Sequence, residues 1–241
     1  MRLVTFSTPE SSGPRLGALL DDDTRVLDLA AAAGEEGADT AAFASMLDLI
    51  DAGPEALDRA RTLAQSPADG ATHARDGVRL HAPLANPRRL RDCACFLQHL
   101  RNSRLTRYTR LAAREDDPEA ALERFRAQGA LDVPPEWVEA PVYLNSNHLS
   151  VIGPGDDVVW PHEARRMDYE LEWAAVTGTP GTDIRAEDAA KHIFGYMIFN
   201  DISARDIQAI EIRSGAGMGG PGKDFDAGNV FGPCIVTADE F

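Results

Sequence analysis

The segment 168–176, with the sequence DYELEWAAV, alternates acidic and large apolar side chains over its first six residues. Successive side chains of a β-strand point to opposite faces, so this period of two predicts a strand. Asp168, Glu170 and Glu172 would share one face, with neighbouring carboxylates about 7 Å apart along the strand. Flexible side chains can bring these like charges closer, where they repel. Such a face is stable if it is solvated, if one carboxyl holds a proton, or if a divalent cation binds there.

The composition bounds the class of protein. With 241 residues and 44% hydrophobic content, the chain can form one large domain or two modest ones. Its formal net charge of −15 argues against binding to nucleic acid or to an anionic membrane surface. The sequence has no apolar run long enough to span a membrane, and its N-terminus MRLVTFSTPE lacks the apolar core of a signal peptide. These features predict a cytoplasmic protein.

The first part of the chain reads as a small α+β domain. Short strands are predicted between residues 3 and 29, followed by helices whose apolar residues recur at three- and four-residue spacing between 43 and 63. A proline-rich stretch after a further short strand places a boundary near residue 85. We therefore predict a small N-terminal domain over residues 1–85 and a second domain over 86–241.

Three local patterns in the second domain have simple structural interpretations. The three cysteines of the chain are too few for a disulfide framework, and Cys93 and Cys95 are expected on the buried face of a strand. Ser203 is a predicted N-cap, with Asp206 as its capping-box partner. The glycine-rich loop over 214–229 does not have the spacing of a phosphate-binding loop, which argues against nucleotide binding.

Four motifs occur in order along the second domain: Asp92 seven residues before His99, the acidic strand, the run FNDISARDIQ at 199–208, and GKDF at 222–225. Together they resemble the fumarylacetoacetate hydrolase family from about residue 88 to the end of the chain. The resemblance implies an α+β, mostly β protein: a mixed β-roll, or distorted barrel, with a small N-terminal α+β domain.

The resemblance also implies a divalent cation, Mg²⁺ or else Ca²⁺ or Mn²⁺. Glu170, Glu172 and Asp201 look like its ligands, and Asp92 looks like a fourth carboxylate ligand. Independently of the resemblance, hard cations prefer oxygen donors, so a sulfur-free carboxylate set favours these ions over Zn²⁺.

Four further residues look like catalytic groups by the same resemblance. His99 resembles a general base that activates water. Arg205, Gln208 and Lys223 resemble groups that hold and polarise a substrate carbonyl, and the two cations can stabilise a developing oxyanion. The structural alternatives are a core histidine for His99, a helix-surface arginine for Arg205 and an ordinary loop lysine for Lys223.

The resemblance implies a metal-dependent hydrolase or decarboxylase that cleaves a carbon–carbon bond in a small β-diketone or 2-oxo acid of the fumarylacetoacetate or acylpyruvate type. One alternative is a tautomerase or isomerase of a 2-oxo acid in aromatic catabolism. Family members mostly form dimers, so a homodimer is expected. They also continue beyond the position of Phe241. We therefore expect the catalytic domain to lack its C-terminal part and the chain to associate through the exposed sheet edge. The second alternative is accordingly a non-catalytic metal-binding subunit.

Overall fold

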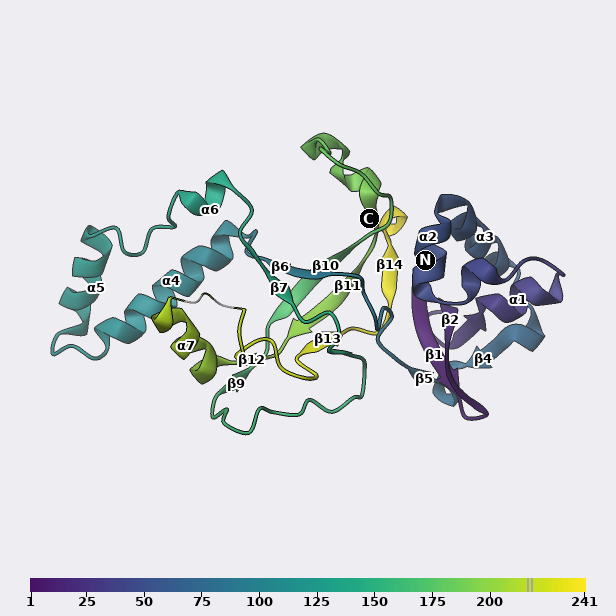
Figure 1. The fold of residues 1–241 in the computed structure, drawn as a ribbon, viewed down its shortest axis with the longest axis horizontal. Helices are drawn as coiled ribbons and strands as arrows, with labels where there is room; N and C mark the ends of the chain where they lie inside the picture. The colour runs from purple at the N-terminus through teal and green to yellow at the C-terminus, as the bar shows by residue number, and fades with distance from the viewer. Residues whose placement is uncertain (216, 218) are drawn as a thin grey trace. The chain divides into compact units, whose positions relative to one another are not determined.

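The computed structural model describes residues 1–215, 217 and 219–241, so two positions of the predicted glycine-rich loop lie outside the described residues. The described chain forms two compact units: one comprises Met1–Arg89 and Asn147–Phe241, and the other comprises Leu90–Ser146. The larger unit is built on a ten-stranded sheet in the order β4-β3-β2-β1-β14-β11-β13-β8, with β10 paired to β11 and β5 paired to β1 (Figure 1).

The N-terminal strands of this sheet are β1 (Arg2–Thr8), β2 (Ser11–Leu20), β3 (Arg25–Asp28), β4 (Thr72–Ala74) and β5 (Arg79–Leu80). Their connections contain α1 (Leu29–Glu35), α2 (Met46–Ala52), α3 (Pro54–Gln65) and the short 3-10 helices η1 (Ala41–Phe43), η2 (Asp69–Ala71) and η3 (Arg75–Gly77). The predicted strands and helices of this region are confirmed.

Capping residues fix where these helices begin. Asp28 ends β3 and accepts a hydrogen bond from the backbone N–H of Ala31, which satisfies a free donor in the first turn of α1. Ser45 caps α2 in the same way. Gly53 has a φ of 79° and separates α2 from α3, whose first residue is Pro54. Two short helices therefore replace one long helix.

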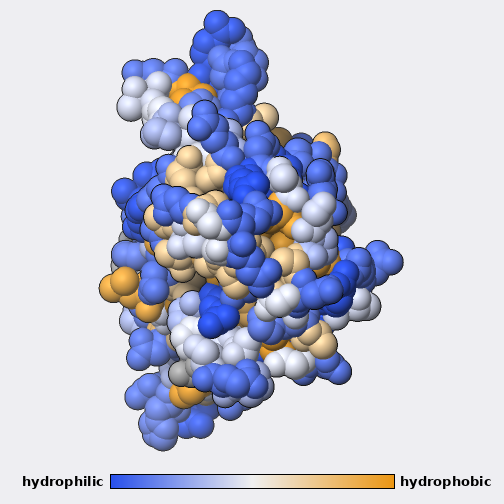
Figure 2. All heavy atoms as spheres, turned by 90° about the vertical axis from the view of Figure 1, so that its right-hand side faces the viewer, coloured by the Kyte–Doolittle hydropathy of each residue, from blue (hydrophilic) through white to orange (hydrophobic). Residues whose placement is uncertain are grey.

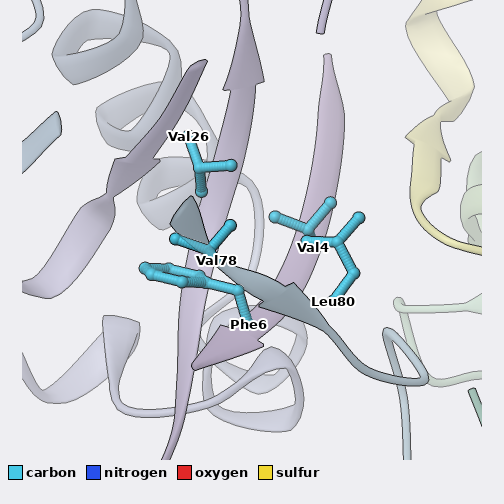
Figure 3. Packing of buried hydrophobic residues seen from close by; sticks show 5 residues of the cluster. All are labelled: Val4, Phe6, Val26, Val78 and Leu80. Atoms are coloured by element: carbon cyan, nitrogen blue, oxygen red, sulfur yellow. The ribbon is translucent and has the colours of Figure 1, made fainter. Parts of the chain in front are cut away.

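The core of the N-terminal strands is a cluster of buried aliphatic and aromatic side chains, Val4, Phe6, Val26, Val78 and Leu80 (Figure 3). Burying a side chain of this size contributes about 1.5–3 kcal/mol to folding. On the face formed by the N-terminal helices, hydrophilic side chains surround smaller apolar patches (Figure 2). The sheet and the inner faces of the helices therefore supply the packing.

The C-terminal strands carry the acidic segment. They are β8 (Val151–Ile152), β10 (Leu171–Thr177), β11 (Ile193–Asp201), β13 (Asn229–Phe231) and β14 (Ile235–Thr237). β11 is central: it pairs antiparallel with β10, with β13 and with β14. β14 also pairs with β1, through Arg2 opposite Val236 and Leu3 opposite Ile235. The N-terminal and C-terminal strands thus form one continuous sheet.

A second, two-stranded sheet of the larger unit pairs β9 (Met167–Asp168) with β12 (Ser203–Ala204) and leads into α7 (Arg205–Ser214). Two 3-10 helices complete the unit, η4 (Ala186–His192) and η5 (Ala238–Glu240).

The smaller unit combines a two-stranded sheet with three helices. β6 (Leu90–Cys93) pairs antiparallel with β7 (Tyr143–Ser146), and α4 (Leu97–Ala112), α5 (Pro118–Ala127) and α6 (Glu136–Glu139) lie between them in the chain. The rings of Tyr108 on α4 and Phe125 on α5 pack against each other, with their centroids 5.2 Å apart.

The predicted fold class is confirmed: the chain is a mixed α+β protein with a curled, half-barrel sheet. The division into residues 1–85 and 86–241 stays a prediction, because compactness within one chain does not test independent folding. Among the described residues, no helix is long and apolar enough to cross a membrane.

The predicted burial of the cysteines is wrong. Cys93 and Cys95 are both exposed. β6 ends at Cys93, and the backbone N–H of Cys95 donates to the carbonyl of Cys93 in a tight turn. The strand is therefore too short to give both side chains the same buried face.

Candidate metal centre

The acidic segment is a strand with a two-residue interruption. β9 ends at Asp168 and β10 begins at Leu171. Glu170 lies in the gap, where its backbone carbonyl accepts from the N–H of Asp201 and its own N–H donates to Oδ1 of Asn200. The side chain of Asn200 thus substitutes for a missing backbone partner and keeps Glu170 aligned with the end of β11.

The predicted alternation of faces is present, but the solvated face is the apolar one. Tyr169, Leu171 and Trp173 are 69%, 73% and 57% exposed. Glu170 and Glu172 are half-buried on the opposite side. A simple solvated row of carboxylates is therefore excluded for these two residues.

Strand register brings the third carboxylate to the same place. Glu172 is opposite Phe199 in the β10–β11 ladder, and Asp201 follows two residues later on the same face of β11. Oxygen atoms of Glu170, Glu172 and Asp201 lie within 4.8 Å of one another. These three predicted ligands converge on one small volume.

Two cations contact this carboxylate group. Nζ of Lys223 lies 2.9 Å from Oε2 of Glu170 and 2.5 Å from Oδ2 of Asp201. Arg205 contacts the other oxygen of Glu170, with Nη1 2.5 Å from Oε1, and its Nε donates to Oδ2 of Asp168 at 2.9 Å. Both oxygens of Glu170 are therefore engaged.

A close backbone approach fixes the position of Lys223. Gly222 packs so tightly on the first turns of α7 that a Cβ there would lie 2.6 Å from the backbone nitrogen of Gln208. The carbonyl of Gly222 accepts from the N–H of Ala204, and the N–H of Lys223 donates to the carbonyl of Gly220. Only glycine fits position 222, and the loop consequently directs Lys223 into the carboxylate group.

The start of α7 differs from its prediction. The N-cap is Ala204, which makes no side-chain cap, whereas Ser203 is buried in β12. Oγ of Ser203 donates to the carbonyl of Asp201 at 3.1 Å and lies 3.5 Å from Oε1 of Glu170. The Ser-x-x-Asp pattern is common to helix caps, but pairing of β12 with β9 overrides it here.

Arg205 and Gln208 lie on a common face of α7. Nη1 of Arg205 donates to Oε1 of Gln208 at 3.1 Å, and Gln208 is buried. The guanidinium is thereby held between Gln208 and two carboxylates. Its planar fork suits such a multidentate contact better than an ammonium would.

The surrounding charges shift the pKa of the central groups. Burial alone would raise the pKa of Glu170, but the charge and hydrogen bond of Lys223, together with Arg205, outweigh it and hold that pKa at about 2. Burial opposes the charged form of Lys223, yet the charges of Asp201 and Glu170 raise its pKa above the ordinary value. Both groups are therefore ionised at neutral pH.

The local charge favours a cation. Asp168, Glu170 and Asp201 pair with Arg205 and Lys223, and Glu172 adds a further carboxylate, so negative charges outnumber positive ones. The donor set contains only oxygen, as Mg²⁺, Ca²⁺ and Mn²⁺ prefer. The ammonium of Lys223 already places one positive charge between the carboxylates of Glu170 and Asp201. The residues present thus fit the predicted ion.

The other two predicted site residues belong to the smaller unit. Asp92 lies half-buried on β6, opposite Leu144. His99 is exposed on α4, with Nε2 3.4 Å from Oγ of Ser103, so it is not a core histidine. Their roles as fourth ligand and general base stay predictions.

Sequence reasoning missed three residues of this centre: Asp168 as a partner of Arg205, Asn200 as the backbone partner of Glu170, and Ser203 beside both ligands. The alternation of Asp168 with Glu170 and Glu172 could have indicated its place in the centre. For Asn200 and Ser203, the sequence offered no indication beyond their place in the FNDISARDIQ run.

Sequence comparisons with known proteins point to one family. Residues 95–241 match the family described as "Fumarylacetoacetate (FAA) hydrolase C-terminal". The chain is 30% identical over 241 residues to a mitochondrial oxaloacetate tautomerase, fahd2, of Xenopus laevis, covering 99% of this chain and 62% of the relative. It is 31% identical over 213 residues to oxaloacetate tautomerase YisK of Bacillus subtilis, covering 85% and 62%. The chain thus spans less than two thirds of these relatives.

Solved structures show the same fold. A fumarylacetoacetate hydrolase from Exiguobacterium antarcticum matches with a TM-score of 0.63 at 24% identity, covering 100% of this chain and 68% of that one. A probable 2-hydroxyhepta-2,4-diene-1,7-dioate isomerase from Mycobacterium abscessus matches with a TM-score of 0.57 at 25% identity, covering 98% and 64%. The predicted hydrolytic activity and cytoplasmic location are not confirmed by these relatives, whose names include tautomerases, an isomerase and a mitochondrial protein.

Proposed function

Because the chain belongs to the fumarylacetoacetate hydrolase family, we propose that it interconverts the keto and enol forms of a small 2-oxo acid of the oxaloacetate type. The observation that carries this proposal is the convergence of Glu170, Glu172 and Asp201 beside Lys223 and Arg205. Two relatives named as oxaloacetate tautomerases support it over the hydrolytic alternative.

The chemistry needs an enolate that is stable enough to form and short-lived enough to be protonated. Glu170, Glu172 and Asp201 would hold a divalent cation, which would supply the positive charge that favours the enolate of a 2-oxo acid. We assign Asp92 as the fourth carboxylate ligand. The identity of the ion, Mg²⁺ before Ca²⁺ or Mn²⁺, is part of the proposal.

The remaining predicted residues act on the organic part of the substrate. Arg205 and Lys223 donate hydrogen bonds to the developing oxyanion, and Gln208 keeps the guanidinium of Arg205 oriented. His99 is proposed to move the proton between the carbon next to the carbonyl and the enol oxygen. No water is consumed, so the reaction balances as a proton transfer within one molecule.

The test is a substrate panel of oxaloacetate, an acylpyruvate and a fumarylacetoacetate-like diketone, each with and without Mg²⁺. We expect Mg²⁺-dependent acceleration of the enol-to-keto conversion of oxaloacetate, followed by ultraviolet absorbance. Cleavage of the acylpyruvate or diketone without this acceleration would support the hydrolase instead. Mg²⁺ binding with no turnover on the panel would support a non-catalytic metal-binding subunit.

We also propose that two copies of the chain associate. The outer face of β10 and β11 exposes Leu171, Trp173 and Ile198, and the ring of Phe241 packs on Trp173. This face is uncharged within a chain of net charge −15, so two copies can meet there without charge repulsion. Light scattering during gel filtration should give a dimer for the wild type and a monomer for the Leu171→Thr, Trp173→Thr double variant. Exposed Ile184→Thr is the control, and an unchanged mass in the double variant refutes this interface.

A further inference from the structure

The position of Lys223 has a consequence for metal binding itself. Its Nζ contacts Oε2 of Glu170 and Oδ2 of Asp201, and its side chain is only 5% exposed. A divalent cation held by Glu170 and Asp201 requires carboxylate oxygens from the same two residues. Both oxygens of Glu170 are already engaged, one by Lys223 and the other by Arg205, so a metal ion bound to Glu170 competes with these side chains.

We propose that Lys223 is an internal competitor of the divalent cation, which must move off Glu170 and Asp201 when the cation binds. The proposal rests on the metal site of the proposed function and is independent of the reaction catalysed there. It assigns Lys223 two successive partners: the carboxylates before the cation binds, and an anionic substrate afterwards.

The arrangement of Arg205 explains why it is not an equal competitor. In the described part of the chain, the ion pairs of Arg205 are with Oε1 of Glu170 and with Asp168. Lys223 contacts two of the three converging carboxylates, and one of them, Asp201, is almost fully buried. Removal of either residue deletes one positive charge near Glu170, and removal of Lys223 also deletes the ion pair with Asp201.

The movement has to come from the side chain of Lys223. Its backbone is held by the hydrogen bond to Gly220 and by the packing of Gly222 on Gln208, so the loop cannot follow easily. A lysine stem has four rotatable bonds and carries a compact charge, which suits a change of partner better than a guanidinium does. The backbone at residue 223 thus stays in place while the side chain of Lys223 changes its partner.

The chain offers a favourable experiment because it contains only two lysines, Lys191 and Lys223. Lys191 is exposed on η4, where it pairs with Asp188. Isothermal titration calorimetry with Mg²⁺ on the whole 241-residue chain compares wild type with Lys223→Met, Arg205→Met and Lys191→Met. Circular dichroism establishes that each variant is folded.

If Lys223 competes, Lys223→Met tightens the Kd for Mg²⁺ by about tenfold or more, since one repulsive charge close to the ion is removed. Arg205→Met should tighten it clearly less, and Lys191→Met should leave it within about twofold of wild type. A folded Lys223→Met variant whose Kd is unchanged or weaker overturns the proposal.

A second measurement does not depend on the stability of any variant. In wild-type protein labelled with ¹³C and ¹⁵N on lysine only, the side-chain signals of Lys223 should shift during the Mg²⁺ titration with the calorimetric Kd, while those of Lys191 stay in place. Saturation with Mg²⁺ without movement of the Lys223 signals overturns this inference alone. Absence of Mg²⁺ binding overturns the metal site, and with it the proposed function.

Discussion

The ammonium of Lys223 lies 2.5 Å from Oδ2 of Asp201, and the two side chains are 5% and 1% exposed. This ion pair joins the glycine-containing loop to the end of β11. Breaking a buried pair leaves an uncompensated charge, which costs far more than a surface pair does. The pair therefore contributes to the fold as well as to the site.

Asp201→Asn should lower the free energy of unfolding by about 3 kcal/mol, because the buried ammonium of Lys223 then loses its ion pair with Asp201. Urea denaturation measures the change. Asp224→Asn, an exposed residue next to Lys223, should cost less than about 0.5 kcal/mol. Equal effects of the two substitutions would show that the buried pair has no special role.

Addition of Mg²⁺ or Mn²⁺ should raise the melting temperature of the wild type. At an ion concentration about 100 times the Kd, binding raises the free energy of unfolding by about 2.7 kcal/mol. Glu170→Ala removes a converging ligand, so most of this gain should disappear, whereas exposed Glu163→Ala should keep it. An unchanged response of Glu170→Ala would refute its role as a ligand.

His99→Ala should slow turnover by about two to four decades if the imidazole transfers the proton. Its Kd for Mg²⁺ should stay close to that of the wild type, because a histidine exposed on α4 is not needed for folding. His162→Ala, an exposed histidine on a loop, is the control for both measurements. Joint loss of folding and metal binding in His99→Ala would point to a structural role.

The free energy of unfolding should fall as the pH is lowered below neutrality, because of His81. Burial, and then the charge of Arg79, lower the pKa of this histidine, whose Nε2 lies 2.8 Å from Oγ of Ser7. The unfolded chain binds the proton near pH 6.5 and the folded chain binds it only at lower pH. The contribution of His81 is therefore complete above pH 6.5 and is lost as the pH falls through the folded pKa.

Urea denaturation at pH 5.5 and 7.5 measures this dependence. His81→Gln should show a smaller loss of stability between the two pH values than the wild type or exposed His162→Gln. Equal losses in all three proteins would show that His81 titrates alike in the folded and unfolded chains.

The sequence was sufficient to predict the fold class and the convergence of Glu170, Glu172 and Asp201. Both were implied by the resemblance to the fumarylacetoacetate hydrolase family. The period of two predicted only that Glu170 and Glu172 share one face of a strand. The interruption at Glu170 could not be predicted, because it depends on the side chain of Asn200 from another strand.

Other errors have the same physical origin. The exposed apolar face of Leu171 and Trp173 reverses the usual orientation of an alternating strand, which is a property of the surrounding sheet. Ser203 matches a helix cap locally but is held in β12 by pairing with β9. The ion pairs of Lys223 depend on how closely Gly222 approaches α7, a contact between segments that local pattern does not encode.

The most direct test of the account is the position of Mn²⁺ in crystals of the wild-type chain, located by its anomalous scattering. We predict one strong peak within about 2.0–2.6 Å of carboxylate oxygens from Glu170, Glu172 and Asp201, with Nζ of Lys223 moved off Asp201. A peak elsewhere, or no peak at saturating Mn²⁺, would contradict the metal centre and the enolate chemistry proposed for it.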